Sequence, residues 1–269
     1  MKLPLLARTG LMFAVMAGST SLGQVIRIKG SDTLGAKLVP ALAESYKSQH
    51  EGSSFEISAE GSAVAFPALV NGTADLGMSS RKATAQELAA ANAKGLKLVE
   101  TVACHDMIVV IVNKANKVKS LTKDQISKIF TGAVKDWSEV GGAPGTISIY
   151  TRNTASGTYK DWQALAMAGK DYAPGSQKLA GSEQVGEEVS KNKNGIGYVG
   201  LAYSEGPGIR SVSIGGVAPV AEKAKEYAYS RACYYYHRED GLPAAKDFVA
   251  YAIGEEGKKL AVKNGFVPD

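Results

Sequence analysis

Residues 147–168 read ISIYTRNTASGTYKDWQALAMA, and the prediction of the fold starts from this stretch. It opens with a short β-rich run, Ile147 to Tyr150, and passes through a segment of glycine and hydroxyl residues, Thr151 to Thr158. A helical pattern follows from Gly157 to Ala168. The same order of strand, polar turn and helix recurs along the chain, which is typical of α/β architecture.

The other elements fit this alternation. Further strand candidates are Val25 to Lys29, Phe55 to Ala59, Ala74 to Met78, Leu96 to Ala103, Met107 to Val112 and Ile196 to Val199. Further helical stretches lie near Leu34 to Ser48, Thr84 to Lys94, Thr122 to Phe130, Ser182 to Asn192, and from Pro243 to Gly265 with an interruption near Gly254. Thr84 with Glu87, and Thr122 with Gln125, have the spacing of capping boxes. The tyrosines between Tyr227 and Tyr236 could form a carbohydrate-stacking surface, but consecutive Tyr residues favour a half-buried strand.

Composition excludes several classes of protein. The chain has 269 residues, of which 45% are hydrophobic and 21% charged, so disorder, collagen and coiled coil are excluded. Lys and Arg number 31 against 26 Asp and Glu, a formal charge of +5 that is spread along the chain. Because there is no basic tract, we expect no nucleic-acid partner, whereas small anions remain possible ligands.

The N-terminus reads as an export signal. Lys2 and Arg8 give a positive n-region, and Leu11 to Ala17 (LMFAVMA) give an apolar core that is too short to span a bilayer. Small residues follow, and we expect cleavage after Gly23. The mature protein should then lie outside the cytoplasm, in the periplasm or an equivalent compartment; the alternative is a buried N-terminal helix.

Two cysteines, Cys104 and Cys233, leave two interpretations open. In an exported chain they can pair, or they can be two buried thiols. Together with His50, His105 and His237 they are too few and too scattered for a zinc site. We therefore expect neither a metal nor a cofactor.

Four short segments of glycine and hydroxyl residues stand where a strand candidate gives way to a helix. They are Gly30 to Leu34 (GSDTL), Glu60 to Ala63 (EGSA), Gly77 to Arg81 (GMSSR) and Thr151 to Thr158 (TRNTASGT). The first N–H groups of a helix lack intrahelical partners and carry partial positive charge, so an anion can bind there. Glycine admits a ligand to the backbone, Ser and Thr add hydroxyl donors, and Arg152 offers a planar fork for two oxygens. Such a site fits phosphate or sulfate better than a sugar or an amino acid.

Each segment also has a simpler explanation. Ser31, Ser62 and Ser80 can be helix caps. Asp32 can be a turn residue, and Arg81 can be a surface ion-pair partner. The stronger signal is Arg152 followed by Ser156, Gly157 and Thr158.

At these segments the sequence resembles the phosphate-binding proteins of bacterial high-affinity phosphate ABC transporters. The matching stretches cover nearly the whole mature chain and are IRIKGSDTL, ISAEGSAVAF, ADLGMSSR, LTKDQISKIFTGAVKDWSEVGG, TRNTASGTY and KNGIGYVG. The stretch from Ile129 to Trp137 marks the family away from the ligand, and we expect Phe130 and Trp137 to be core anchors.

The resemblance implies a type II periplasmic-binding-protein fold, in which two α/β lobes are joined by two crossing strands and the ligand lies in the cleft. Lobe I would be discontinuous, Gln24 to Cys104 plus Tyr234 to Asp269, and lobe II would span His105 to Cys233. Both cysteines would then lie near the crossings, and the resemblance thereby favours a disulfide that constrains the hinge.

The resemblance also assigns roles within the site. Thr33 and Leu34 would offer backbone N–H groups, and Thr33 its hydroxyl as well. Ser62 would contribute its hydroxyl and N–H, Arg152 would pair with phosphate oxygens, and the donors from lobe II would also include Ser156, Gly157 and Thr158.

Two departures from the family pattern concern selectivity. Ser80 replaces an Asp that accepts the hydrogen of protonated phosphate in some relatives, and Asp32 could be the substitute acceptor. Thr154 stands where an acidic residue often orients the arginine. An acceptor matters for selectivity because protonated phosphate can donate a hydrogen bond to it, whereas fully deprotonated sulfate cannot.

The function implied is capture of inorganic phosphate by closure of the lobes, as a monomer, and delivery to the membrane permease subunits of an ABC transporter. Two alternatives stay open. One is a secreted phosphate-ester hydrolase with Ser62 or Ser156 as nucleophile, which would need a base or a metal beside the hydroxyl. The other is an oxyanion sensor that presents its closed form to a receptor.

Overall fold

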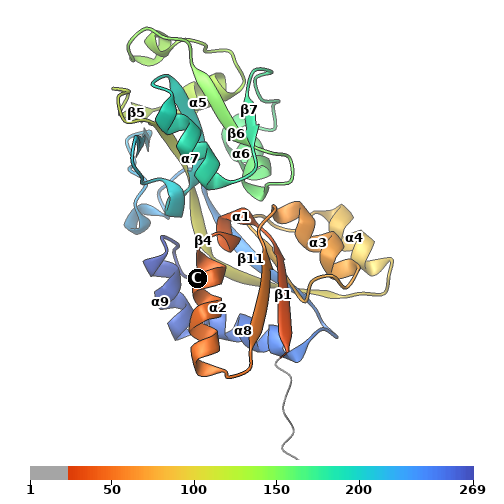
Figure 1. The fold of residues 1–269 in the computed structure, drawn as a ribbon. Coiled ribbons are helices and arrows are strands. Elements are labelled where there is room, and N and C mark those ends of the chain that lie inside the picture. Colours follow the sequence, from red (N-terminus) through yellow and green to blue (C-terminus); the bar gives the residue numbers. More distant parts are fainter. Residues whose placement is uncertain (1–23) are drawn as a thin grey trace, which may run out of the picture.

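The computed structural model describes residues 24–269. The predicted signal segment, residues 1–23, lies outside these residues. Figure 1 shows two α/β bodies, one above the other. We keep the predicted names for them: lobe I is the lower body, with the first strand and the C-terminal helices, and lobe II is the upper one. The predicted boundaries at 104/105 and 233/234 stay a prediction.

The strands form one large sheet and a small two-stranded one. The strands are β1 Val25–Gly30, β2 Ser54–Ser58, β3 Leu76–Ser79, β4 Leu98–Asn113, β5 Ser120–Leu121, β6 Ser148–Arg152, β7 Gln177–Leu179, β8 Gly195–Gly200, β9 Ile209–Ser211, β10 Ser213–Ile214 and β11 Ser230–Arg238. The order in the large sheet is β2-β1-β3-β11-β4-β8-β6-β7, with β9 also beside β4, and β5 pairs with β10. Neighbours β1, β2 and β3 are parallel, as are β6, β7 and β8, whereas β11 is antiparallel to β3 and β4. This is the mixed α/β architecture that the alternating sequence predicts, and each lobe has its own parallel strands.

The helices cover these strands. The α-helices are α1 Asp32–Gly35, α2 Leu38–Gln49, α3 Ser62–Val70, α4 Ala85–Asn92, α5 Lys123–Phe130, α6 Gly157–Met167, α7 Ser182–Lys191, α8 Pro243–Ile253 and α9 Glu255–Lys263, and the 3-10 helices are η1 Trp137–Val140, η2 Leu201–Tyr203 and η3 Ala221–Lys223. Both predicted capping boxes are formed, at Thr84 with Glu87 and at Thr122 with Gln125. The predicted C-terminal helix is interrupted at Gly254, as expected.

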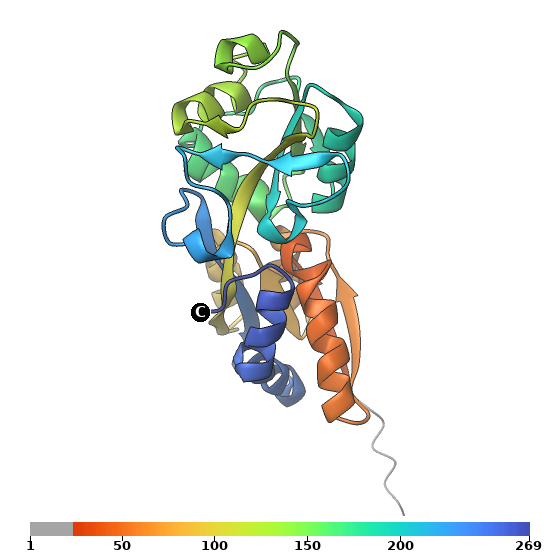
Figure 2. The same cartoon turned by 90° about the vertical axis from the view of Figure 1, so that its left-hand side faces the viewer.

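Two strands run through both lobes. The sequence predicts two separate strands, Leu96 to Ala103 and Met107 to Val112, but the structure has the single 16-residue strand β4 across this region. The prediction of a break was wrong because Asp106, a residue that strands seldom bury, is fully buried there and paired with Arg231 on β11. Figure 2 shows β4 passing from one lobe into the other. The long strand therefore forms the connection between the lobes together with β11.

The two cysteines lie on this pair of strands. Cys104 and Cys233 are register partners across β4 and β11, at the point where a bulge shifts the register. Both are buried, free thiols, so the disulfide that the resemblance favours is not formed in the structure. Contact with Cys233 and burial raise the pKa of Cys104, so its thiol stays protonated at neutral pH.

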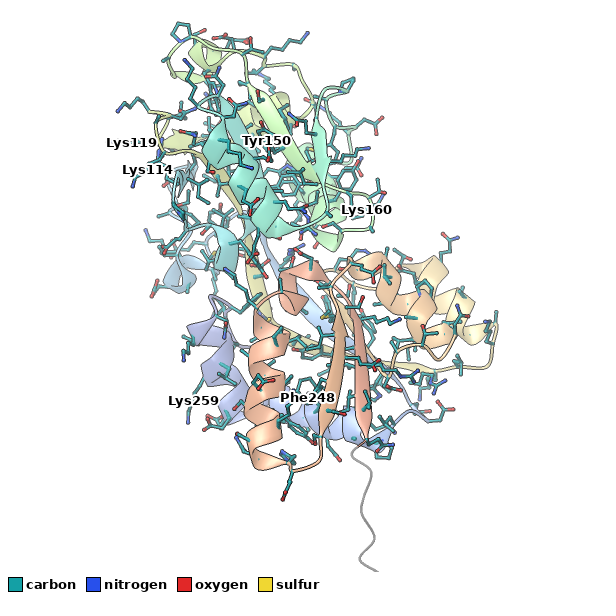
Figure 3. The ribbon with its side chains drawn as sticks, viewed as in Figure 1. Lys114, Lys119, Tyr150, Lys160, Phe248 and Lys259 are labelled. Carbon is teal, nitrogen blue, oxygen red and sulfur yellow. The ribbon has the colours of Figure 1, made fainter. Side chains whose placement is uncertain are left out.

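Each lobe has its own hydrophobic core. Lobe II buries Phe130 and Trp137, as predicted for core anchors, and Trp162 stacks on Tyr198 there. In lobe I, α2 and α8 pack against β1, with Phe248 in the interior (Figure 3). On β11 alternate side chains enter different clusters, Tyr235 with α2 and Tyr236 with α3. The tyrosine-dense stretch is therefore a strand with buried faces, as predicted, although the strand begins at Ser230.

Candidate functional site

The four glycine and hydroxyl segments meet at the junction of the lobes. Within lobe I the backbone joins three of them, because Gly61 donates its N–H to the Gly30 carbonyl at 2.7 Å and Ser31 donates to the Met78 carbonyl at 2.8 Å. The fourth segment comes from lobe II, where Ala155 accepts a hydrogen bond from the N–H of Ala63 at 3.1 Å. Segments that are far apart in the sequence therefore form one cluster.

Glycine is required at two of these positions. Gly30 has φ 135° and Gly61 has φ 126°, a region that residues with a side chain rarely adopt. A Cβ at Gly30 would lie 2.1 Å from the Met78 carbonyl oxygen, and a Cβ at Gly61 would lie 2.6 Å from the Ala155 oxygen. These two glycines allow the close approach that brings the segments together.

Two serines of lobe I face the first turn of α6. The hydroxyl oxygens of Ser62 and Ser80 are 3.2 Å apart, and the Ser80 N–H donates to Ser62 Oγ at 3.0 Å. A Cβ placed on Gly157 would lie 2.4 Å from Ser62 Oγ and 2.6 Å from Ser80 Oγ. Ser62 stands at the start of α3, as the resemblance implies. Ser80 follows β3 directly, and the next helix, α4, begins at Ala85 with Thr84 as its N-cap, where the sequence predicts it.

A threonine pair also joins the two lobes. Thr33 Oγ1 and Thr158 Oγ1 are 2.9 Å apart, and both residues are buried. Ser31 and Ser156 act as N-caps of α1 and α6, because their hydroxyls accept from the N–H groups of Leu34 and Tyr159. The capping role of Ser31 that the sequence left open is thus present in the structure.

Arg152 ends β6 and is 1% exposed. Its Nε and Nη2 donate to the Ala180 carbonyl at 3.2 and 2.6 Å, and its Nη1 donates to Ser182 Oγ at 2.8 Å. Burial lowers the pKa of the guanidinium, and the nearby carboxylate of Asp32 opposes this effect. Because a guanidinium has five N–H groups and lobe II engages three, two remain for an anion or for Asp32.

Asp32 places a carboxylate beside Arg152, where the resemblance leads us to expect an acidic residue at the position of Thr154. Its Oδ2 lies 2.9 Å from Arg152 Nη1 and accepts hydrogen bonds from the N–H and the hydroxyl of Ser182, at 3.0 and 2.8 Å. Asp32 belongs to lobe I, whereas both partners belong to lobe II. The sequence places no carboxylate beside Arg152, since the two residues are 120 positions apart.

Arg81 is held apart from the other candidates. Both of its terminal nitrogens pair with the Glu87 carboxylate, at 2.8 and 2.6 Å, and the guanidinium lies over the Phe66 ring. It makes no hydrogen bond to another candidate residue within 24–269. The structure therefore gives Arg81 the ion-pair role that the sequence left open.

A second buried arginine, Arg231 on β11, was missed by the sequence interpretation. Its Nη2 donates to Thr158 Oγ1 at 2.8 Å and to Asp106 at 3.0 Å, and its Nη1 donates to Asp161 at 3.2 Å. Burial disfavours its charge, but the two carboxylates outweigh burial and raise the pKa of Arg231. No local signal could find this residue, because its partners come from α6 and β4.

Charge and donors in the site suit an anion. Thr158 Oγ1 accepts from Arg231, so its own hydrogen is available to a neighbouring acceptor. The hydroxyls of Thr33, Ser62 and Ser80 add neutral donors, and the N-terminus of the eleven-residue helix α6 adds backbone N–H groups. The arrangement can surround a small oxyanion with donors from both lobes.

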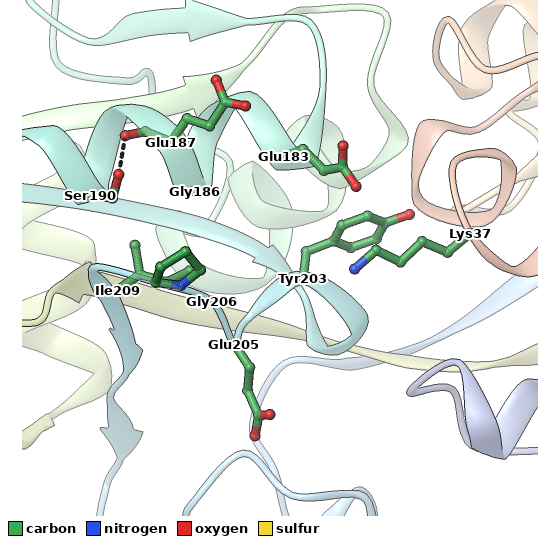
Figure 4. A pocket seen from close by; sticks show the side chains of 10 residues that line it. Lys37, Glu183, Gly186, Glu187, Ser190, Tyr203, Glu205, Gly206 and Ile209 are labelled. Atoms are coloured by element: carbon green, nitrogen blue, oxygen red, sulfur yellow. Dashed lines mark hydrogen bonds between the residues drawn. The ribbon is translucent and has the colours of Figure 1, made fainter.

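A separate cavity of about 230 Å³ lies beside this cluster and is lined by α7 and the segment around η2. Figure 4 shows Lys37 reaching toward Tyr203 at its edge. Lys37 donates to the Ala202 carbonyl at 2.7 Å, and the Tyr203 hydroxyl donates to the Thr33 carbonyl at 3.0 Å. These contacts also cross from one lobe to the other.

Known proteins resemble this chain over most of its length. The model of the PBP superfamily domain matches residues 15–256. The phosphate-binding protein PstS of Pseudomonas aeruginosa is 32% identical over 264 residues, which cover 89% of this chain and 81% of that protein. PstS of Bacillus subtilis is 28% identical, with 90% and 80% covered.

Solved structures agree in fold. A putative phosphate ABC transporter substrate-binding protein from Clostridium perfringens, with bound phosphate, has a TM-score of 0.85 at 29% identity and covers 91% of this chain and 100% of its own. An ABC-type phosphate transport receptor from Vibrio cholerae has a TM-score of 0.74 at 27% identity, again with 91% and 100% covered. The predicted type II periplasmic-binding-protein fold is confirmed. The chain belongs to the PBP superfamily and, within it, to the family of phosphate-binding proteins that includes PstS of Pseudomonas aeruginosa.

Proposed function

We propose that this chain is an extracytoplasmic solute-binding protein that captures inorganic phosphate between its lobes and delivers it to the permease of an ABC transporter. The observation that carries the proposal is the meeting of buried donors from both lobes, above all the 2.9 Å approach of Thr33 Oγ1 and Thr158 Oγ1. The relatives from Pseudomonas aeruginosa and Bacillus subtilis are phosphate-binding proteins, and the matching structure from Clostridium perfringens holds phosphate.

Binding in this proposal is coupled to closure of the lobes about β4 and β11. Lobe I contributes Thr33, Leu34, Ser62 and Ser80, and lobe II contributes the start of α6 and Arg152. Neither half of the donor set can surround the anion alone, so the closed arrangement binds it more tightly than an open one. Each hydrogen bond to the charged ligand contributes about 1.5 to 3 kcal/mol before the cost of ordering is subtracted.

The contacts of the two candidate nucleophiles favour binding over hydrolysis. Among the hydrogen bonds of residues 24–269, Ser62 Oγ has Ser80 as its only partner residue, and Ser156 Oγ accepts from the Tyr159 N–H. A nucleophilic serine needs an adjacent base, and these partners are neutral donors. Export is supported by the predicted signal segment, and no helix within residues 24–269 is long and apolar enough to cross a bilayer.

Calorimetric titration of the purified protein with phosphate, and then with sulfate, tests this function. Thr158→Val removes one hydroxyl from the site with little change in shape, so we expect phosphate affinity to fall by at least about tenfold, the equivalent of 1.4 kcal/mol. Thr146→Val, which removes an exposed hydroxyl from the same lobe, is the matched control and should bind as the unchanged protein does. Equal affinity for the two variants, or turnover of a chromogenic phosphate ester by the unchanged protein, would contradict the proposal.

A further inference from the structure

The Asp32 side chain makes all of its polar contacts across the interlobe junction. Asp32 is the first residue of α1 in lobe I, and its side chain is 12% exposed. Its Oδ2 accepts from the N–H and Oγ of Ser182 and lies 2.9 Å from Arg152 Nη1. Among residues 24–269, no group of lobe I hydrogen-bonds to this carboxylate. Separation of the lobes would therefore break every one of its side-chain contacts.

The partners of Asp32 are a helix N-terminus and a buried guanidinium, and a nearby negative charge stabilises both. Ser182 is the first residue of α7, a ten-residue helix, and its N–H is one of those that no helix carbonyl can satisfy. Arg152 is buried, and in lobe II it has only the neutral acceptors Ala180 O and Ser182 Oγ. Closure therefore brings the counter-charge that a buried guanidinium requires.

We propose that Asp32 is an interlobe latch and a positioning residue. It orients Arg152 for the anion and stabilises the closed arrangement through contacts that are independent of the ligand's own oxygens. This inference deepens the proposed function and rests on it for its effect on phosphate affinity. This role differs from that of an acceptor for the phosphate hydrogen. In the structure, the carboxylate oxygen Oδ2 of Asp32 already accepts from Ser182 and lies beside Arg152.

The two interpretations predict different results for Asp32→Asn. A latch acts on the closed state, so its loss weakens phosphate and sulfate by the same factor and shows as faster release. We expect at least about a fivefold loss of phosphate affinity, the lower end of usual coupling between sites, with an association rate that changes little. If Asp32 instead accepted the hydrogen of phosphate, Asp32→Asn would replace that acceptor by an amide. The ratio of phosphate affinity to sulfate affinity would then fall.

The experiment compares the unchanged protein with Asp32→Asn, Ser182→Pro and Glu183→Gln. Proline removes both Ser182 donors, yet it is favoured at the first position of a helix, and Gly181 before it is extended with ψ 159°. Ser182→Pro should therefore show the same loss of affinity as Asp32→Asn, so that either variant tests the latch if the other folds poorly. Glu183 is exposed and lines the same interlobe cavity as Asp32, so Glu183→Gln removes an equal charge without a contact across the lobes.

Affinities come from calorimetry with inorganic phosphate and from sulfate competition, and release rates come from stopped-flow fluorescence. An affinity for Asp32→Asn within twofold of Glu183→Gln, or a loss confined to the phosphate-to-sulfate ratio, would overturn the latch while leaving the proposed function intact. If the unchanged protein binds no phosphate, the proposed function fails. Small-angle scattering of both proteins without ligand then tests the latch separately. We expect Asp32→Asn to have a larger radius of gyration than the unchanged protein, and equal radii would refute the latch.

Discussion

Substitution of Gly157 by alanine should block closure of the lobes without harming either lobe. Gly157 is the first residue of α6 in lobe II, and an added Cβ would lie 2.4 Å from Ser62 Oγ and 2.6 Å from Ser80 Oγ in lobe I. Real Cβ contacts essentially never fall below 3.0 Å, so the lobes would have to separate or the serines would have to turn away. The clash exists only where the two lobes meet.

The size of the effect follows from this geometry. Overpacking a close contact by one methyl group costs about 1 to 3 kcal/mol, and this cost applies to the closed state alone. Phosphate affinity should therefore fall by roughly 5- to 150-fold, since each 1.4 kcal/mol is a factor of ten. The backbone of Gly157 is not in the left-handed region, so alanine should leave the unliganded protein as stable as before or more stable by about 0.4 to 1 kcal/mol.

Calorimetry with phosphate, together with thermal unfolding in its absence, separates the two effects. Gly186→Ala is the matched control, because this glycine lies in α7 of the same lobe and its added Cβ would meet only Ile209 Cδ1, at an ordinary 3.6 Å. If Gly157→Ala binds phosphate within twofold of Gly186→Ala, the lobes do not meet in this way when the ligand binds, and the reasoning fails.

Two further predictions concern buried and half-buried ion pairs. Burial of Asp75 opposes its charge, but hydrogen bonds from Arg27 outweigh burial and lower the pKa of Asp75. The stability from this pair should therefore be present above the unfolded value of about 3.9 and be lost as the pH falls through the folded value. Asp75→Asn should cost about 1 kcal/mol at pH 7, a discounted figure because the Arg27 side chain is 39% exposed, and in urea unfolding the difference should shrink steadily as the pH is lowered below about 3.9. Arg231→Met should cost about 3 kcal/mol or more in the same assay at pH 7, because Asp106 and Asp161 lose their cation, and a cost below 1 kcal/mol would contradict the geometry.

The sequence predicted the elements whose signals are local. The turn from β6 into α6 and both capping boxes could be located because a few adjacent residues determine them. Helix α3 was absent from the helical stretches that the sequence suggested, since SAVAFPALV is apolar almost throughout, contains a proline and has no polar face to set a period.

Contacts between distant residues could not be predicted. Asp32 and Arg152 meet only because two lobes come together, and Arg231 reaches Thr158 only because β11 crosses between them. Asp106 lay outside both predicted strands, and its burial within β4 could not be foreseen because its cation lies 125 positions away in the chain. Side-chain chemistry in the sequence therefore indicated candidate residues for an oxyanion site, but it could not indicate how those residues are oriented.

The placement of Arg231 has a mechanical consequence. This residue lies on β11, which pairs with β4, two positions before the bulge at Cys233 and Tyr234, and its guanidinium donates to Thr158 in the first turn of α6. Twisting of the paired strands β4 and β11 would therefore move the Arg231 guanidinium relative to Thr158. A shift of α6 would in turn move these two strands. In the proposed closure, the two strands about which the lobes would rotate are thus coupled through Arg231 to the helix whose N-terminus would bind the anion.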